Sequence, residues 1–253
     1  MGGLRLGVEH ASPVRPAPST LGAVGERGSH RESCSQLVPG STGQARLPGG
    51  ALLEPARLGV VKNARYRRAM TLESWATAQA ERLIAPLGDR WTHVQAVADK
   101  ARSLGAVLSV EDADLLAAAA LVHDVGYAPS LNRLGFHAVD GARFLRAQGQ
   151  ERLARLVAYH SGARFEAQER GLVEELATFP VEDGPVMDAL TFADMTTGPA
   201  GQPMTLAQRI EEVQRRYSPD DPVHRAIVRA RPELQAAIDR IRQRLDGESA
   251  QPM

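Results

Sequence analysis

The chain has 253 residues, enough for one large domain or two small ones, and 43% of them are hydrophobic, which suffices for a buried core. Lysine and arginine together number 30, as do aspartate and glutamate, so the net charge gives no reason to expect nucleic acid or an anionic membrane as a partner. Aromatic residues make up only 4%, while Ala and Leu are frequent after Met70. This composition favours helices over sheets, and we expect an all-α protein.

Cysteine content and hydropathy bear on the compartment. Cys34 is the single cysteine and cannot form an internal disulfide, which fits a reducing environment. No apolar run approaches the roughly 20 residues that span a bilayer. The first residues, MGGLRLGVEHASPV, lack the apolar centre of a secretory signal. Together these features predict a cytoplasmic location.

The pattern of the chain changes abruptly near Met70. Residues 1–69 are rich in Gly, Ser, Pro and Arg and show no sustained helical or strand period, so we expect a disordered tail or an over-extended start. From Met70 onward, Leu72, Trp75 and Leu83 fall on one helical stripe. The folded domain is therefore expected to cover residues 70–253.

The rest of the domain reads as successive helices joined by short loops. Ser109, followed by Asp112, is expected to cap one helix, and Thr205 with Gln208 forms a capping-box pattern. The helices are expected at about 91–104, 110–124, 137–148, 151–160, 186–194, 205–217, from Pro222 onward and, last, at 234–245.

Histidine and aspartate recur where helical apolar stripes end or would otherwise continue. A carboxylate that points toward a core is unfavourable by several kcal/mol unless it is paired or bound to metal. Imidazole and carboxylate together suit Zn, Fe, Mn or Co, and facing helices can bring such ligands together. The pattern therefore predicts a metal site without thiolates. The residues concerned are His93, His123, Asp124, His160 and Asp194.

The order THVQAVA, LVHDVGY and TFADM resembles the HD superfamily, in which a His, an adjacent His-Asp pair and a distal Asp bind a divalent metal. GFHAVDGARFL and AYHSGAR resemble the two further histidines of HD members that hold two metals. The resemblance implies a single compact HD-type bundle with a core at about 91–196, closing helices at 205–246, and one or two divalent ions (Mn, Fe, Co, Zn or Mg). The ligands it implies are His93, His123, Asp124, His137, His160 and Asp194.

The closest local resemblance is to the symmetrical diadenosine-tetraphosphate hydrolases. It rests on the Arg-x-x-His segment that begins at Arg90 and on the His-Ala-x-x-Gly segment from His137 to Gly141. It implies a small phosphorylated substrate of the nucleotide class. The residues after Asp194, MTTGPAGQP, depart from the Asp-Tyr-Ile-Glu-Pro type of segment expected there, so the substrate stays open.

The resemblance also implies roles for individual residues. With two ions bound, Asp124 would bridge them, and with His123 it would stand at the centre of catalysis. His93, His123 and Asp194 would complete one ion, and His137 with His160 the other. Such ions would activate water for attack on phosphorus. Three arginines near these motifs are candidates for phosphate contacts, because Arg forms forked bonds to phosphate oxygens: Arg90, Arg133 and Arg164.

Two other functions stay open at this point. Some HD proteins hold two irons and oxidise organic substrates with O2, as inositol oxygenase does. Others bind a metal and a nucleotide as sensors without catalysis. The arginines beside the ligand motifs favour hydrolysis, since an oxygenase has no evident use for them. The sequence does not indicate an oligomeric state.

Overall fold

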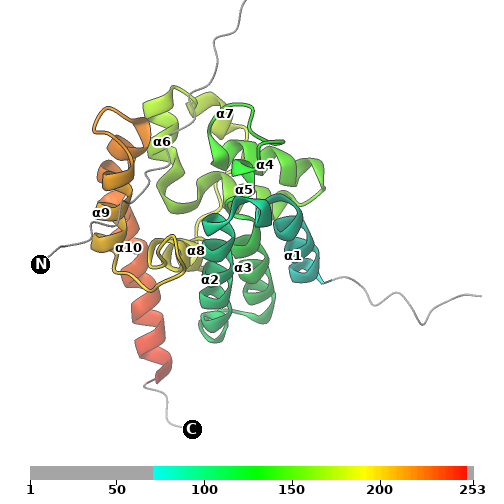
Figure 1. Cartoon of the computed structure of the whole chain (residues 1–253). Coiled ribbons are helices and arrows are strands. Elements are labelled where there is room, and N and C mark those ends of the chain that lie inside the picture. The colour runs from blue at the N-terminus through cyan, green and yellow to red at the C-terminus, as the bar shows by residue number, and fades with distance from the viewer. Residues whose placement is uncertain (1–70, 250–253) are drawn as a thin grey trace, which may run out of the picture. The chain divides into compact units, whose positions relative to one another are not determined.

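The computed structural model describes residues 71–249, which fall within one compact unit and form helices and loops. The described part contains one isolated β-bridge, between Thr197 and Pro203, and no strand (Figure 1). The predicted all-α class is confirmed. The segment 1–69, predicted to be disordered, lies outside the described residues.

The α-helices of residues 71–249 are joined by short loops and 3-10 turns (Figure 1). None of them combines the length and apolar character that crossing a membrane requires. The α-helices are α1 (Leu72–Leu83), α2 (Asp89–Ser103), α3 (Val110–Val122), α4 (His137–Ala147), α5 (Glu151–Tyr159), α6 (Ala163–Arg170), α7 (Val173–Ala177), α8 (Pro185–Met195), α9 (Leu206–Arg216) and α10 (Pro222–Ser249). The 3-10 turns are η1 (Ala85–Leu87), η2 (Gly105–Val107), η3 (Val125–Tyr127) and η4 (His160–Gly162).

Helix α3 is the central helix of the first half of the fold and packs against α1, α2, α5 and α8. Its residues from Leu115 to Val122 are all buried, as expected for a helix that is apolar on every side. Four of them are consecutive alanines, whose short side chains allow neighbouring helices to pack closely against α3. The predicted cap is confirmed, since the backbone N–H of Asp112 donates to Ser109 Oγ at 3.2 Å. The C-terminal end of α3 thus lies deep inside the fold.

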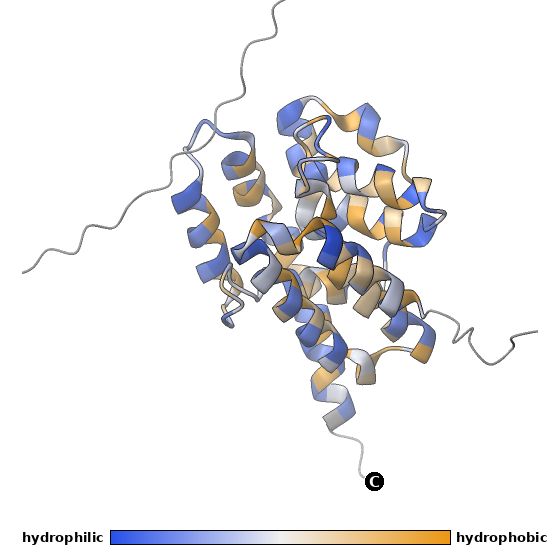
Figure 2. Ribbon diagram, turned by 45° about the vertical axis from the view of Figure 1, so that its right-hand side comes forward, coloured by the Kyte–Doolittle hydropathy of each residue, from blue (hydrophilic) through white to orange (hydrophobic). Residues whose placement is uncertain are grey.

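Buried hydrophobic side chains form two clusters. The larger cluster joins α1 to α8, with Ile241 of α10, and we call α1–α8 the main bundle. The smaller joins the end of α8 to α9 and α10, which we call the C-terminal layer. Figure 2 shows hydrophobic residues on the sides of the helices that face one another and hydrophilic residues on the outer sides. The smaller cluster consists of Met195, Leu206, Ile210, Val213, Ile227, Ala230, Leu234 and Ile238.

Polar contacts fix the C-terminal layer in place. Thr205 and Gln208 form the predicted capping box at the start of α9. On α10, the Arg240 guanidinium donates two hydrogen bonds to the buried carboxylate of Asp188 on α8, at 2.6 and 2.7 Å. A forked pair of this kind fixes orientation as well as distance, so α10 is held against α8.

The structure differs from the sequence prediction in two segments. Residues 163–177, for which no helix was predicted, form α6 and α7. After Pro222 the sequence predicts two helices, but the structure has one, α10, with Pro232 inside it. A proline lacks the N–H that would bond the carbonyl four residues earlier, here that of Val228. Because Pro232 and Val228 are both exposed, that carbonyl can bond water instead, and the helix continues.

Candidate metal centre

His123 and Asp124 stand at the point where α3 ends. The last carbonyls of a helix lack partners within it, and His123 Nδ1 donates to one of them, Ala120 O, at 2.8 Å. A carbonyl can only accept, so Nδ1 carries the proton and the neutral ring presents a lone pair at Nε2. His123 Nε2 is buried and has no hydrogen-bond partner among the described residues. Burial lowers the pKa of His123, against the charges of Asp124 and Asp194, which raise it.

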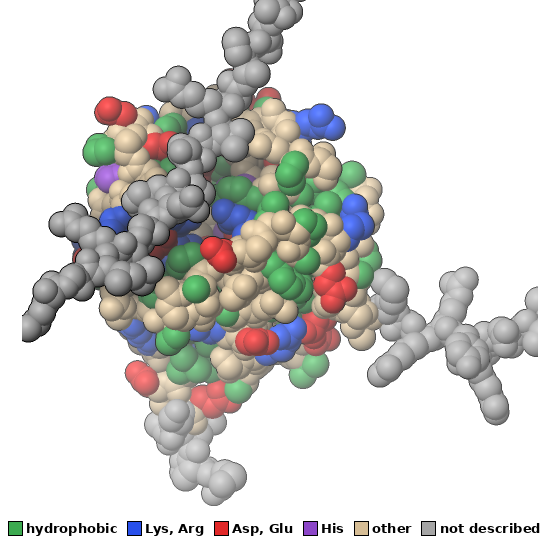
Figure 3. Space-filling view, viewed as in Figure 1, with side chains coloured by type: hydrophobic (Ala, Val, Ile, Leu, Met, Phe, Trp, Pro, Cys, Tyr) green, Lys and Arg blue, Asp and Glu red, His purple; other side chains and the backbone are tan. Residues whose placement is uncertain are grey.

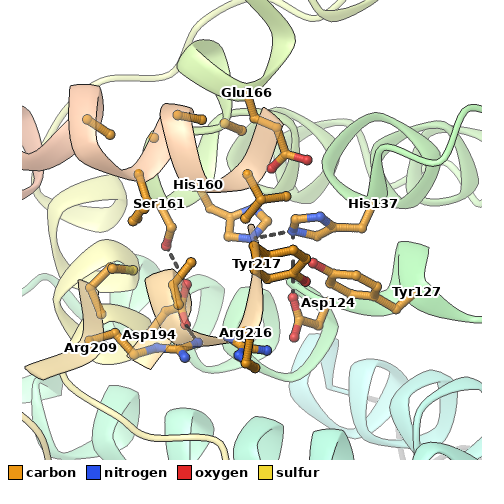
Figure 4. Close-up of a pocket in the computed structure, with 18 of the residues that line it drawn as sticks. Asp124, Tyr127, His137, His160, Ser161, Glu166, Asp194, Arg209, Arg216 and Tyr217 are labelled. Atoms are coloured by element: carbon orange, nitrogen blue, oxygen red, sulfur yellow. Dashed lines mark hydrogen bonds and ion pairs between the residues drawn. The ribbon is translucent and has the colours of Figure 1, made fainter. Parts of the chain in front are cut away.

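His160 uses the same arrangement at the end of α5. Its Nδ1 donates to Val157 O at 2.6 Å, so that Nε2 faces inward, toward His137. The chain then turns through Ser161, at φ +50°, and Gly162, at φ +79°. This turn places the Ser161 hydroxyl within 2.5 Å of Asp194 Oδ2, to which it donates (Figure 4). The histidine and the distal aspartate are therefore linked through one short turn.

His93 of α2 and Asp194 of α8 meet across the bundle. His93 Nε2 lies 3.1 Å from Asp194 Oδ1, and its Nδ1 donates to Gly198 O at 3.1 Å. Burial opposes protonation of His93, but the hydrogen bond to Asp194 and the nearby carboxylates raise its pKa. Burial would raise the pKa of Asp194, yet that bond and the neighbouring histidines hold it well below its usual range. Gly198 belongs to the segment TTGPAGQP, where the sequence departs from the tetraphosphate hydrolases. In the structure, that segment accepts a hydrogen bond from a predicted ligand, His93.

Asp124 lies between the histidines. Its Oδ1 is 3.6 Å from His123 Nε2 and 3.7 Å from His137 Nε2, while its Oδ2 accepts a hydrogen bond from Arg90 Nη1 at 2.5 Å. Burial would raise the pKa of Asp124, but the surrounding His123, Arg90 and His137 hold it far below its usual range. One oxygen is thus occupied by arginine, and the other faces histidines from two directions.

His137 is the first residue of α4 and is oriented by an aromatic contact. The Tyr127 ring stacks on it with centroids 4.2 Å apart and planes at 15°, and the Arg90 guanidinium carbon lies 3.4 Å from the Tyr127 ring centroid. Arg90, Tyr127 and His137 therefore form one stack. Burial lowers the pKa of His137 to about 3, so its ring is neutral near pH 7 and its nitrogen lone pair is available to a metal.

A contact between backbones sets the distance from the His-Asp pair to α4. A Cβ added to Gly126 would lie 1.9 Å from His137 O and 2.6 Å from Gly141 N. Gly141 is tight as well, because a Cβ there would lie 3.1 Å from Gly126 N. Glycine at both positions lets η3 touch the first turn of α4, which brings Asp124 close to His137.

The six predicted ligands gather into two groups. His93, His123 and Asp194 form one, and Asp124, His137 and His160 form the other; within each, one ligand atom per residue lies within 4.8 Å of the rest. His137 Nε2 and His160 Nε2 are 3.4 Å apart. Both groups combine imidazole with carboxylate, which suits a divalent transition metal. Together with the unpartnered Nε2 of His123, this donor set fits a metal ion.

The comparison with protein families bears on this centre directly. Residues 90–210 match the model of the HD domain, and the match includes all six ligand positions. This part of the chain belongs to the HD superfamily. HD domains bind divalent metals and are commonly metal-dependent hydrolases, which agrees with the two groups found here. The comparisons with curated proteins and with solved structures give no match.

A cavity that is open to solvent at its mouth gives access to the candidate metal centre. Asp124, His137, His160 and Asp194 line it from the main bundle, and residues of α9 and α10 line the opposite side. Figure 3 shows a recessed area on this face in which histidine and basic side chains reach the surface. In Figure 4, the side chains of the two sides lie around one common space.

Only one of the three predicted phosphate-binding arginines lies in this cavity. Arg90 lines it. Arg133 lies outside the cavity, and its side chain is exposed. Its backbone N–H donates to the buried Asp140 and so helps to fix the loop before α4. Arg164 also lies outside it, paired with Glu233 of α10 and close to the Phe165 ring.

Two further arginines that line the cavity were missed from the sequence: Arg209 and Arg216, both on α9. The Glu212 carboxylate accepts hydrogen bonds from both. A signal was present in RIEEVQRR, where arginines seven residues apart flank Val213 on one helical face. Periodicity alone could not decide whether that face meets solvent or a cavity.

Proposed function

We propose that this chain is a metal-dependent phosphohydrolase that hydrolyses a phosphate ester or anhydride of a small molecule of the nucleotide class. One observation carries the proposal: two buried His/Asp groups face a single cavity that arginine side chains also line. Metal ligands alone fit several reactions, whereas arginines beside them suit phosphoryl oxygens. A cytoplasmic location, as predicted from the sequence, is part of the proposal.

In this proposal, different residues of the chain bind the ions and orient the ligands. His93, His123 and Asp194 would hold one ion and Asp124, His137 and His160 a second, with Asp124 Oδ1 facing both groups. A bound divalent ion supplies Lewis acidity, which favours attack by water on phosphorus and neutralises phosphoryl charge. Arg90 holds Asp124 Oδ2 and thereby turns Oδ1 toward the histidines.

The nucleophile in this proposal is water. Among the described residues that line the cavity, Ser161 alone has an aliphatic hydroxyl, and that hydroxyl donates to Asp194 Oδ2. The other oxygen of Asp194 contacts His93. Ser161 is therefore better placed to orient Asp194 than to attack phosphorus. The arginines favour this reaction over O2 chemistry, in which two cationic side chains on α9 would have no evident role.

Phosphate release by the full chain tests the proposal. The protein is loaded with Mn²⁺ or Co²⁺ and assayed on nucleoside mono-, di- and triphosphates and on diadenosine tetraphosphate. The double variant His123→Ala/Asp124→Ala is expected to lose bound metal and phosphate release together. Asp99→Ala, an exposed carboxylate of α2, is the matched control and should change neither.

Three outcomes would contradict the proposal. Turnover that survives in the double variant would overturn the assignment of His123 and Asp124. Iron-dependent O2 uptake without phosphate release would favour the oxygenase alternative. Binding of metal and nucleotide without any turnover would favour the sensor.

A further inference from the structure

The cavity has both charged and apolar lining residues. Six lining residues are charged, three arginines and three carboxylates: Arg90, Arg209, Arg216, Asp124, Glu166 and Asp194. Arg90 is paired with Asp124 at 2.5 Å. Arg216 is paired with Glu212, which lies behind it, at 2.6 Å. Most of the positive charge is therefore already neutralised by protein carboxylates.

Arg209 also has carboxylate partners, on two sides. Its side chain is buried, its Nη1 bonds Glu212, and its Nη2 lies 3.8 Å from Asp194 Oδ1. Its Nε is buried without a hydrogen-bond partner among residues 71–249. A buried N–H without a partner is unfavourable unless a ligand completes it. Because Arg209 lines the cavity next to the distal aspartate, its guanidinium can contact one phosphoryl group held at the candidate metal centre.

One wall of the cavity is apolar. It is formed by side chains of α9 and α10, and all of them except Ala226 belong to, or pack against, the smaller hydrophobic cluster: Val213, Val223, Ala226, Ile227 and Ala230. This wall begins directly beside the ligands, because a Cβ added to Gly162 would lie 2.7 Å from Ala230 Cβ. Gly162 is two residues from His160, so a group attached to a phosphate at the centre meets the apolar wall at once.

The remaining charged lining residue is Glu166 of α6, whose carboxylate disfavours the binding of a second phosphate group. It is buried, lines the cavity, and its Oε1 accepts a hydrogen bond from Arg170 Nε at 2.6 Å. Figure 4 shows its carboxylate on the same side of the space as His160 and His137. A second phosphate would be placed between this carboxylate and apolar side chains, where its charge is poorly solvated.

From these contacts we infer that the substrate is a phosphate monoester whose organic group is uncharged and presents apolar surface next to the phosphate. Nucleoside monophosphates belong to this class, whereas triphosphates and dinucleoside polyphosphates do not. The inference rests on the proposed function. In the reaction, an oxygen–phosphorus bond forms to water and the phosphorus–oxygen bond to the organic group breaks. The water proton passes to the leaving oxygen, giving an alcohol and inorganic phosphate.

Relative turnover by the metal-loaded full chain is the first test. Phenyl phosphate and thymidine monophosphate are expected to be hydrolysed with kcat/KM about 100-fold or more above that for thymidine triphosphate and diadenosine tetraphosphate. Glucose 6-phosphate, a monoester with a strongly polar organic group, should fall between the two classes. A tetraphosphate or triphosphate hydrolysed as fast as the monoesters would overturn the inference and leave the hydrolase intact.

Binding provides a readout that does not depend on turnover. Calorimetry on the metal-loaded chain is expected to give a lower Kd for phenylphosphonate than for inorganic phosphate or methylenebisphosphonate. Val223→Asp, at a partly buried lining position, should weaken phenylphosphonate about tenfold and leave inorganic phosphate within about twofold. Val228→Asp, at an exposed position of the same helix, is the control and should change neither.

Turnover and binding together distinguish a failure of the proposed function from a failure of the inference about the substrate. If no compound is hydrolysed with any metal while phenylphosphonate binds as expected, the proposed function is wrong and the ligand class is supported. If Val223→Asp and Val228→Asp bind phenylphosphonate equally well, the apolar wall does not contact the organic group and the inference is overturned.

Discussion

The main bundle and the C-terminal layer contribute different things to one cavity. Every candidate metal ligand comes from the main bundle or its turns, where helix ends and backbone contacts fix the side chains. The C-terminal layer contributes the arginines of α9 and the apolar side chains of α10. The difference suggests that the bundle determines whether a metal binds and the layer determines which substrate is accepted.

The largest expected effect tests the rigidity of the main bundle. In Gly126→Ala, the new Cβ would meet the His137 carbonyl at 1.9 Å, and both partners are backbone. The free energy of unfolding in urea is expected to fall by about 3 kcal/mol or more, because η3 must move away from α4. Bound metal should be lost with it, as Asp124 would no longer face His137.

A glycine of the C-terminal layer gives the matched control. At Gly247 of α10, an added Cβ meets nothing within 4 Å. Gly247→Ala is expected to leave stability unchanged or to raise it by up to about 1 kcal/mol, as alanine favours helices. Equal losses in both variants would contradict the role given to the contact between Gly126 and α4.

The next effect separates metal binding from substrate binding. Arg209→Gln is expected to lower kcat/KM about 100-fold, since a charged partner of the phosphoryl group is removed, while bound metal stays as in the parent chain. His123→Gln should lose metal and activity together. Metal content is measured by atomic emission after gel filtration, beside the kinetics.

Arg215, exposed on the same helix, provides the control for Arg209. Arg215→Gln should preserve both kcat/KM and metal content. Loss of metal from Arg209→Gln would contradict the separate roles given to the main bundle and the C-terminal layer, because α9 would then contribute to metal binding.

The smallest effect concerns the tie between the two regions. Asp188→Asn weakens the forked pair with Arg240, whose side chain is half exposed, so the free energy of unfolding should fall by only about 1 kcal/mol. Asp239→Asn, in an exposed pair with Arg242, should change it by about 0.3 kcal/mol or less. A loss of several kcal/mol at Asp188 would mean that the layer is coupled to the bundle far more tightly than this contact indicates.

Much of the fold was predictable because its helices carry local signals. Ser109 and the pair Thr205 and Gln208 cap helices as their patterns predict, and the apolar stripe of α8 ends at Asp194. The single helix through Pro232 was not predictable, since it depends on a carbonyl reaching solvent. Helix α7 was missed because five residues with one buried leucine, Leu176, give no period.

The candidate site divides in the same way. The six ligand positions were indicated by motifs on helix ends, and the structure brings them together. The arginines were harder to place, since guanidinium groups are frequent in this chain and their role depends on which helix face meets a cavity. Arg133 and Arg164 follow ligand motifs in the sequence but point elsewhere, whereas Arg209 follows none and lies beside Asp194.

The hydrogen bonds behind the histidines have a consequence for how an ion enters. His123 and His160 are anchored to carbonyls at the ends of α3 and α5, and His93 is anchored to the Gly198 carbonyl. Ion uptake then freezes few side-chain torsions, so little conformational entropy is lost. Release of water from the ion and the cavity is left as the dominant entropy change, and uptake should grow more favourable as temperature rises.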